Sequence, residues 1–264
     1  MRDKLFSGDF KTDPSEQLVI NLVNGFNLSQ TEVALLGKLL GIGLADKMRL
    51  LLVRPVARAR QLALPLVRFM LAEQLGGAFA TVLDNNILCI VDAGYFSPAH
   101  ESRAEAFEAY LEDNGFIACL SRTFSDVSDI QSHYKMASRA IKLKEQIDPD
   151  HNAFFNYDTY MPLHLISASA KVADLESFVA PEISTLVAYD EAHGTELAGT
   201  LLQFYRNTCD IKRTSKALNF HYNTIDYRLR RITEICGTDV RDPDVVVSLQ
   251  LSLLIVRYLK LSSD

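Results

Sequence analysis

Cysteine is scarce in this chain, which has four cysteines among 264 residues. They lie far apart, so neither a C-x-x-C pair nor the spacing typical of a zinc site occurs. Three of them stand in apolar runs such as NILCIV and FIACL, where a free cysteine acts as a small hydrophobic residue. The six histidines are scattered singly. We therefore expect a protein of the reducing cytoplasm, without a metal site.

Long apolar runs are also missing. The most apolar stretch, residues 245–259, contains Ser, Gln and Arg, and it is shorter than the roughly 20 residues that a membrane-spanning helix needs. The N-terminal sequence MRDKLFSGDFKTDPSE has no apolar segment of the kind found in a secretory signal. A Gly-rich phosphate loop, a G-x-S-x-G motif and an H-E-x-x-H motif are absent. We expect no membrane attachment, no bound cofactor and no enzymatic activity of the kinds these motifs mark.

Positive charge is in the minority overall but is concentrated in one segment. The chain has a formal net charge of −6, with 48% hydrophobic and 23% charged residues, which is typical of a globular protein. Residues 211–231 contain six positive side chains and only one negative, Asp226, for a net charge of +5, so the remainder carries −11. Such asymmetry within one chain indicates a surface that binds a polyanion.

The first part of the chain has the pattern of an α+β domain. Two short capped helices are expected within residues 14–40, followed by alternating strand and helix signals. The expected elements are strands at 47–55, 78–83, 86–91, 116–121 and 153–158, and helices at 65–76, 101–115 and 126–147. The β-α-β-β-α-β order predicts a ferredoxin-like fold, with helices on one face of an antiparallel sheet. An Asp84-Asn85-Asn86 turn predicts a hairpin between two of the strands.

From about residue 161 onward the signal is helical only. Apolar positions recur at helical spacing over 171–190, and helices are expected at 195–207, 210–218, 221–237 and 242–260. We therefore divide the chain into an N-terminal helical arm (1–45), an α+β domain (46–160), a helical connector (161–194) and an all-α C-terminal domain (195–264). The last helix is apolar nearly all round, which predicts a fully buried helix. The alternative is that part of it also forms a dimer interface.

Residues 210–237 fit a helix-turn-helix, in which a short helix and a second helix cross at a sharp turn. Ser215 is small enough for a close approach of the two helices, and Asn219 tolerates positive φ at the turn. Phe220 can bury between them. On a helical wheel at 100° per residue, one stripe of the second helix is apolar and should be buried. That stripe contains Ile225, Leu229, Ile232 and Cys236.

The opposite face of the second helix carries side chains that suit DNA. Asn223, Tyr227 and Arg230 lie on it, with Arg231 and Asp226 on its flanks, and such groups can meet base edges and phosphates. The residues expected to enter the major groove first are Tyr222, Asn223 and Thr224. Lys212, Arg213 and Thr214 should hold phosphates together with the amides of the first helix. Arg228 should pack its stem and reach a phosphate or an acidic partner, and His221 is expected to be a cap or a phosphate contact. The alternative from the same pattern is a helical subdomain with a solvated basic face.

Specific stretches also resemble a known family. TLLQFYRN, RTSKALNFHYNTIDYRLRRITEICG and DVRDP, followed by an apolar helix, resemble the C-terminal helix-turn-helix domain of the PucR/CdaR family of bacterial transcription regulators. The H-x-N-T-x-x-Y-R-L core carries the resemblance, although Tyr222 stands where the family commonly has Arg and Ser215 where Ala is usual. Upstream, FIACLSRTFSDVSDIQSHYKMASRAIKL and FFNYDTYMPLHLI resemble the GGDEF-like middle domain of that family. The two resemblances together cover most of residues 47–260.

The resemblance implies a transcription regulator that binds double-stranded DNA as a homodimer, under the control of an unidentified small-molecule effector. Family members often carry a sensory domain upstream, and only about 45 residues precede the α+β domain here, so we expect either that sensing lies elsewhere or that the chain is a fragment. A GGDEF cyclase needs carboxylates at the end of its first strand and at its hairpin turn to hold metal ions. Here these positions are LVRP and LDNN, so we expect a non-catalytic domain. The rival interpretation is a ligand-binding or nucleotide-handling domain with a structural helical tail.

Overall fold

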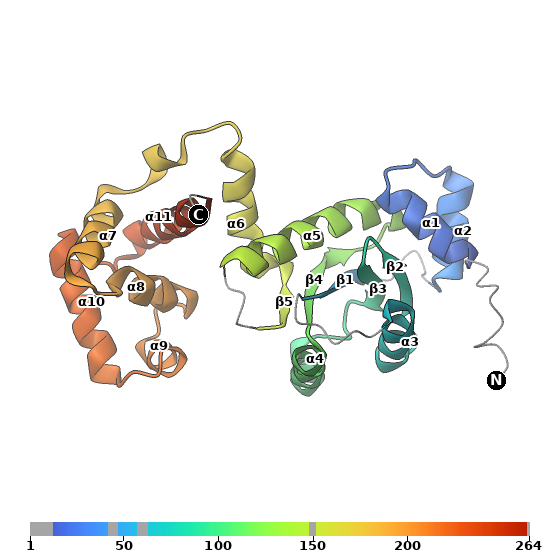
Figure 1. The fold of residues 1–264 in the computed structure, drawn as a ribbon, viewed down its shortest axis with the longest axis horizontal. Coiled ribbons are helices and arrows are strands. Elements are labelled where there is room, and N and C mark those ends of the chain that lie inside the picture. Colours follow the sequence, from blue (N-terminus) through green and yellow to red (C-terminus); the bar gives the residue numbers. More distant parts are fainter. Residues whose placement is uncertain (1–12, 42–46, 57–62, 148–151, 263–264) are drawn as a thin grey trace. The chain divides into compact units, whose positions relative to one another are not determined.

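The computed structural model describes residues 13–41, 47–56, 63–147 and 152–262, and they form two compact units. The first unit contains a sheet with helices on it, and the second is helical (Figure 1). The boundary between the units lies between Met161 and Pro162, within helix α6 (Tyr157–Ser169). Among the described residues, no helix has the length and apolar character needed to cross a bilayer.

The first unit begins with two helices, α1 (Pro14–Val23) and α2 (Gln30–Leu39). The side chain of Asp13 accepts a hydrogen bond from the amide of Ser15 at the start of α1. Ser29 and Glu32 form a reciprocal capping box at the start of α2. The prediction of two short capped helices over residues 14–40 is therefore confirmed.

Five strands form the sheet, in the order β2-β3-β1-β4-β5. They are β1 (Met48–Pro55), β2 (Phe79–Leu83), β3 (Asn86–Asp92), β4 (Phe116–Phe124) and β5 (Phe154–Asn156). The first four pair antiparallel in the ferredoxin-like order, which confirms the predicted α+β fold. The short strand β5, which lies outside this four-stranded plan, pairs parallel with β4, so the complete sheet is mixed and not antiparallel throughout.

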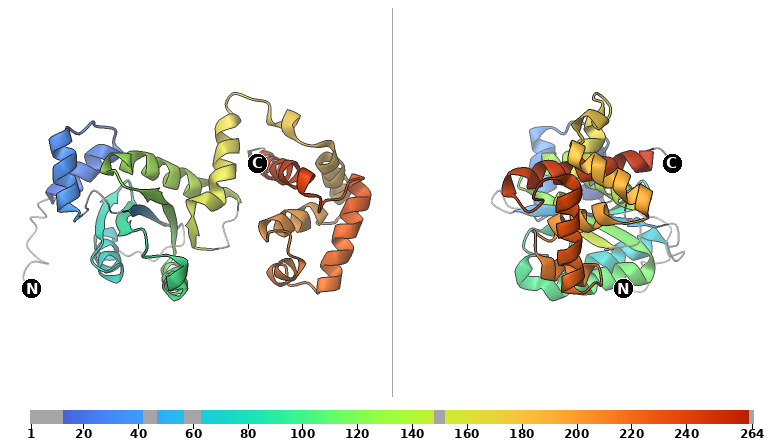
Figure 2. Two further views of the ribbon diagram at one scale, coloured as in Figure 1. Left: turned by 180° about the vertical axis from the view of Figure 1, so that it is seen from behind. Right: turned by 90° about the vertical axis from the view of Figure 1, so that its left-hand side faces the viewer.

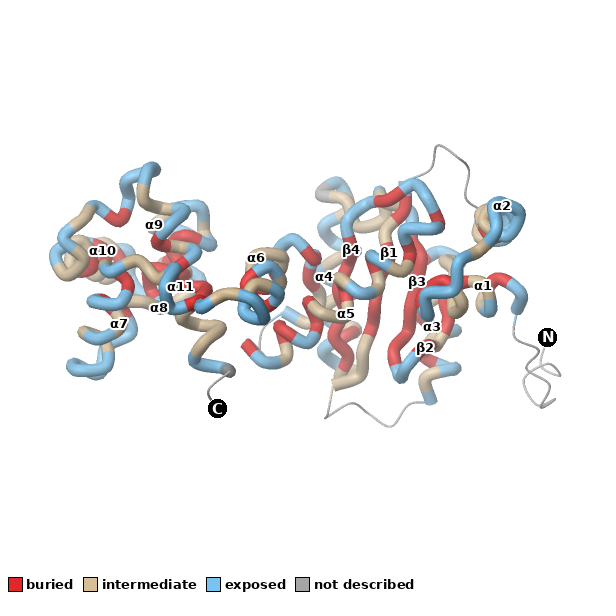
Figure 3. The backbone as a smooth tube through the Cα atoms, turned by 90° about the horizontal axis from the view of Figure 1, so that it is seen from above, coloured by how far each residue is buried: buried red, intermediate tan, exposed pale blue. Residues whose placement is uncertain are grey.

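Helices cover both faces of the sheet, whereas the ferredoxin-like plan predicted them on one face. The helices concerned are α3 (Leu64–Gln74), α4 (Glu101–Asn114) and α5 (Ile130–Ile147). Leu51 and Val53 of β1 belong to the core shared with α3 and α4, which lie below the sheet in Figure 1, while α5 lies above it. Leu50 and Leu52, on the opposite side of the same strand, are also fully buried. The central strands are buried along most of their length, as Figure 3 shows, because both faces are covered.

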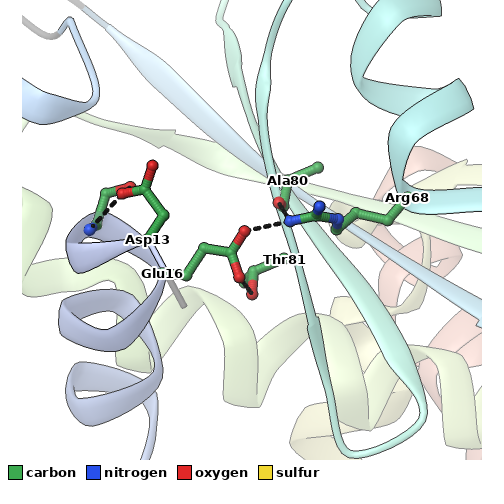
Figure 4. A network of polar contacts seen from close by, with 6 residues as sticks. Asp13, Glu16, Arg68, Ala80 and Thr81 are labelled. Atoms are coloured by element: carbon green, nitrogen blue, oxygen red, sulfur yellow. Dashed lines mark hydrogen bonds and ion pairs between the residues drawn. The ribbon is translucent and has the colours of Figure 1, made fainter. Parts of the chain in front are cut away.

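Side-chain bonds connect helix α1 to the sheet and to helix α3 (Figure 4). Glu16 of α1 forms an ion pair with Arg68 of α3, and the hydroxyl of Thr81 in β2 lies 3.5 Å from the second oxygen of the same carboxylate. Arg68 also donates to the carbonyl oxygen of Ala80 at 3.4 Å. The N-terminal helices therefore pack as part of the first unit.

The second unit contains five helices that matter for the site. They are α7 (Pro181–His193), α8 (Leu197–Arg206), α9 (Ile211–Ala217), α10 (Tyr222–Cys236) and α11 (Pro243–Ser262). Helix α10 packs against α7, α8 and α9, as Figures 1 and 2 show. Between residues 171 and 180 the chain forms turns and a short 3-10 helix, Leu175–Phe178, so the helix expected over 171–190 begins only at Pro181.

Helix α11 is buried on one side only, so the prediction that it is fully buried is wrong. Leu249, Leu253 and Ile255 are buried, but Val247 is 73% exposed and Leu251 is 40% exposed. The two exposed residues are four positions apart and therefore lie on one face of the helix. The apolar composition of α11 thus exceeds what the core of this unit covers.

Candidate nucleic-acid interface

The turn between α9 and α10 has the geometry of a helix-turn-helix. Asp210 caps α9 by accepting a hydrogen bond from the amide of Arg213 at 3.0 Å. Asn219 has a φ of 53°, which confirms its predicted role at the turn. The amide of Phe220 donates to the carbonyl of Ser215 at 3.0 Å, and this bond brings the chain back across the end of α9.

Phe220 was expected to bury in the angle between the two helices, but it does not. Its side chain is 40% exposed. The guanidinium of Arg228 lies over its ring, 4.3 Å from the ring centroid, and donates to the hydroxyl of Thr200 at 2.9 Å. The head of Arg228 is therefore directed toward a hydroxyl of its own unit, not toward an acidic partner, and the cation stacks on the aromatic ring that was expected to fill the core.

The buried stripe of α10 agrees with the helical wheel. Ile225, Leu229 and Ile232 are fully buried against α7, α8 and α9. Cys236 is half-buried, and burial raises the pKa of its thiol to about 11. Since this stripe faces the interior of the unit, the opposite side of α10 is directed outward.

His221 and Asn223 have different roles at the start of α10. The Nδ1 atom of His221 accepts a hydrogen bond from the amide of Asn223 at 3.2 Å, so His221 is the N-cap, as expected. The side chain of Asn223 is exposed, and so are those of Tyr222 and Tyr227. These three side chains form the outward surface at the N-terminal end of the helix.

Two cations from α9 lie beside this surface. Lys212 and Arg213 line a shallow hollow of about 620 Å³ together with Tyr222 of α10. The structure contradicts the predicted phosphate contact by Thr214, because its side chain is fully buried and donates to the carbonyl of Asp210 at 2.7 Å. The amide of Arg213 is already bonded to the side chain of Asp210, so it does not offer the free donor that was expected at this helix end.

Arg230 and Arg231 are each held by an acid on their own helix. Arg230 donates to Asp226 at 2.8 Å, and Arg231 donates to Glu234 at 2.8 Å. Arg231 also reaches the hydroxyl of Tyr189 in α7, at 3.3 Å. These bonds give the two guanidinium groups defined positions on opposite flanks of the outward face.

A second hollow of about 530 Å³ lies between α10 and the turn from α7 to α8. Thr224, Tyr227 and Arg231 line it from α10, and Tyr189 and Thr195 line it from the other side. The predicted site residues therefore lie on two sides of α10, with Tyr222 next to α9 and with Thr224 and Arg231 next to the turn from α7 to α8. Tyr189 and Thr195 were missed because they lie outside the basic segment, where no local charge or spacing signals them.

Arg241 was missed for a different reason. It lies in the turn after α10 and donates to the carboxylate of Asp226 at 2.9 Å. In the sequence it stands among Asp239, Asp242 and Asp244, so its charge is cancelled in any count over neighbouring residues. Within the part of the chain that the structure describes, no three His, Cys, Asp or Glu side chains gather as metal ligands would.

Two domain families match the chain. A GGDEF-like domain matches residues 25–143, and the PucR C-terminal helix-turn-helix domain matches residues 197–255. The second match includes all of α8, α9 and α10 and most of α11. The GGDEF-like match begins within residues 1–45, which were predicted to be a separate arm, and this agrees with the packing of α2 in the first unit.

Curated bacterial regulators are similar over parts of the chain. The carbohydrate diacid regulator of Escherichia coli is 28% identical over 200 residues, which cover 68% of this chain and 51% of that protein. The DNA-binding transcriptional activator AdeR of Bacillus subtilis is 26% identical over 49% of this chain and 31% of that protein. The purine catabolism regulatory protein of Bacillus subtilis is 32% identical over 33% of this chain and 16% of that protein. The chain matches about half of the length of these relatives, or less.

The order of the two domains, the helix-turn-helix geometry of α9 and α10, and these relatives agree with the resemblance found in the sequence. The chain contains a GGDEF-like domain followed by a PucR-type helix-turn-helix domain, and over these parts it is similar to regulators of the PucR/CdaR family.

Proposed function

We propose that this chain is a DNA-binding transcription regulator that acts in the cytoplasm and reads the major groove with α10. The observation that carries the proposal is the outward face of α10, which is held by a fully buried stripe and bears polar, aromatic and basic side chains at the N-terminal end and along its flanks. A rigid helix that presents such groups next to a second, basic helix is the arrangement by which helix-turn-helix proteins bind DNA. The similarity to AdeR, a DNA-binding transcriptional activator, supports the same proposal.

The exposed side chains divide into two roles in this proposal. Asn223, with Tyr222 and Tyr227 beside it, contacts base edges, because these residues project from the first two turns of α10. Lys212 and Arg213 contact phosphates, because they stand beside Tyr222 on the neighbouring helix. Thr224 and Arg231, on the flank toward α7, support the phosphate contacts.

We further propose that the protein works as a homodimer. A single helix-turn-helix covers one half-site, and a two-fold dimer reads two half-sites separated by about one turn of DNA. The exposed apolar face of α11, with Val247 and Leu251, supports this proposal, since a second copy of the same face could cover it. Binding of a small-molecule effector would then act on the dimer.

The GGDEF-like domain is proposed to be regulatory and without catalytic activity. At the end of β1, where a cyclase of this type carries a metal-binding carboxylate, the chain has Arg54. Its guanidinium bonds to Asn86 of the hairpin at 2.9 Å, to Ser138 at 3.2 Å and to Glu145 at 3.3 Å. A fixed positive charge beside the hairpin turn disfavours a divalent cation there. This supports a domain that keeps the fold and has lost the metal chemistry.

A mobility-shift assay with fragments of genomic DNA tests the proposal. Retarded fragments that compete poorly with unrelated DNA are expected. No retardation of any fragment, at low salt and micromolar protein, would favour the rival interpretation of a ligand-binding or nucleotide-handling domain with a structural helical tail.

A further inference from the structure

Asp226 is the one acidic residue in the basic segment 211–231, and it lies on a flank of the outward face of α10, with 26% of its side chain exposed. Asn223, Asp226 and Arg230 are spaced i, i+3 and i+7, so they form one stripe along the helix. A carboxylate at this position would repel the phosphates of DNA if it were unpaired. The contacts of this carboxylate therefore decide whether it opposes DNA binding.

The two oxygens of this carboxylate hold two different arginines. Oδ2 accepts from Arg230 at 2.8 Å, and Oδ1 accepts from Arg241 at 2.9 Å. The hydrogen bond from Arg241 is the main reason that the pKa of Asp226 lies below its usual range, with the bond from Arg230 contributing as well. Asp226 is consequently ionised, and the group of three carries a net charge of +1.

Arg241 reaches α10 from the turn that follows it. The backbone amide of Arg241 donates to the side chain of Asp239 at 2.9 Å, which shapes this turn. Both guanidinium groups stay accessible, with side-chain exposures of 68% for Arg230 and 40% for Arg241. Ion pairs this exposed add little to stability, so stability alone does not account for the arrangement.

We propose that Arg241 is a further DNA-backbone contact and that Asp226 is a positioning residue that fixes Arg230 and Arg241 at one edge of the recognition surface. The inference rests on the proposed function and deepens it by adding a phosphate contact from the turn after α10 to those proposed for α9 and for the flank toward α7. Phosphate contacts set the register of a helix in the groove without reading sequence. Asp226 thus holds two cations at the spacing that keeps Asn223 over its base.

The first test uses the full chain and a pool of random-sequence duplexes, with binding measured across a range of salt concentrations. Arg241→Ala should weaken binding. It should also reduce the magnitude of the slope of log affinity against log salt by about one, because one counterion fewer is released. Arg241→Lys should keep the slope, because the charge remains. The matched control is Lys260→Ala, which removes the same charge from a pair with Glu191 on another surface of the unit and should leave the slope unchanged. An Arg241→Ala slope equal to that of Lys260→Ala would overturn the contact.

The second test separates positioning from charge, using a duplex that the wild-type protein selects from the same pool. Asp226→Asn should keep or raise affinity for the random pool, while preference for the selected duplex falls about fivefold or more, as for loss of one base contact. Higher affinity with the preference intact would show that Asp226 acts only as a repulsive charge, and would overturn the positioning role. Absence of wild-type binding would contradict the proposed function itself, whereas wild-type binding with unaffected variants contradicts this inference alone.

Discussion

Asn223 and His221 stand two positions apart at the start of α10, and the structure gives them different tasks. His221 caps the helix, because its ring nitrogen accepts the amide of Asn223. The side chain of Asn223 is therefore not used for capping and is exposed to solvent. An exposed asparagine at this position can form a bidentate pair with adenine in the major groove.

Asn223→Ala should relax sequence preference at one base position, at a cost of roughly 1–3 kcal/mol of discrimination. Because the cap is provided by His221, the melting temperature should stay close to that of the wild type. Binding to random DNA at low salt should also stay nearly intact. Melting and selection experiments on the same variant check both statements. A lower melting temperature with unchanged relative affinities would mean that Asn223 acts structurally.

Lys212 and Arg213 should act on all DNA sequences alike. Each of the variants Lys212→Ala and Arg213→Ala should weaken binding and reduce the magnitude of the slope of log affinity against log salt by about one. Titrations at several salt concentrations measure this slope. Thr214→Ser serves as a control on the same helix, since its buried hydroxyl can still bond to Asp210. Slopes equal to the wild-type slope in both charge variants would remove these residues from the interface.

The sequence predicted the residues of α10 better than those of α9. Fifteen residues of α10 make four turns, so the wheel separates Ile225 and Leu229 from Asn223 clearly. Helix α9 has seven residues, and its inward side is decided by contacts with α8 and α10, which no local period reveals. Thr214 was therefore assigned to the wrong side. Arg241 was missed because the acidic residues around it cancel its charge in a local count, and because its partner Asp226 lies 15 positions away in the chain.

At the scale of elements, the turn between α9 and α10 sets the angle at which α10 is presented. Asn219 adopts a left-handed conformation there, which costs a residue with an ordinary side chain about 1 kcal/mol or more. Asn219→Ala should thus lower the free energy of unfolding of the helical unit by about 1 kcal/mol, whereas Asn219→Gly should be close to neutral because glycine accepts positive φ.

Denaturant unfolding of the full chain, followed by circular dichroism, compares the two variants at this position. Equal stability of Asn219→Ala and Asn219→Gly would show that the backbone conformation at residue 219 does not limit the stability of the turn. Since both substitutions remove the same side-chain amide, the difference between them isolates the backbone term.

The positions of the helices and strands were predicted well from the sequence, but the packing around them was predicted less well. Capping residues and the hairpin turn define ends by local chemistry, and Asp84 and Asn85 do adopt the positive φ expected at the turn. The layer arrangement depends on contacts between distant segments. The apolar run at residues 50–53 was compatible with a strand covered on both faces, and the ferredoxin-like plan alone suggested one face. Likewise, the composition of α11 does not tell which of its apolar residues stay exposed.

For the molecule as a whole, the two units have different proposed roles. The GGDEF-like unit has a buried sheet with helices on both faces, and the second unit carries the outward face of α10 that is proposed to bind DNA. Arg54 at the end of β1 is bonded to the hairpin and to α5. Arg54 therefore connects strand, hairpin and helix at the edge where a cyclase of this type would carry its metal-binding acids.

Purified protein with GTP or ATP and Mg²⁺ should therefore form no cyclic nucleotide. Chromatography of the reaction against a heat-inactivated control measures the product. Arg54→Asp, which restores an acid at the end of the strand, should not create activity, because the hairpin still lacks its acidic sequence. Product formed by the wild-type chain above the control would contradict the non-catalytic interpretation of this unit.

Methylation interference on a duplex selected by the protein can show whether α10 reads the major groove. Methylation of guanine N7 lies in the major groove, and methylation of adenine N3 lies in the minor groove. N7 methylation is expected to block binding in two half-sites about one helical turn apart, and N3 methylation within these half-sites is expected to have little effect. Interference confined to the minor groove, or binding that is insensitive to both modifications, would contradict major-groove recognition by α10.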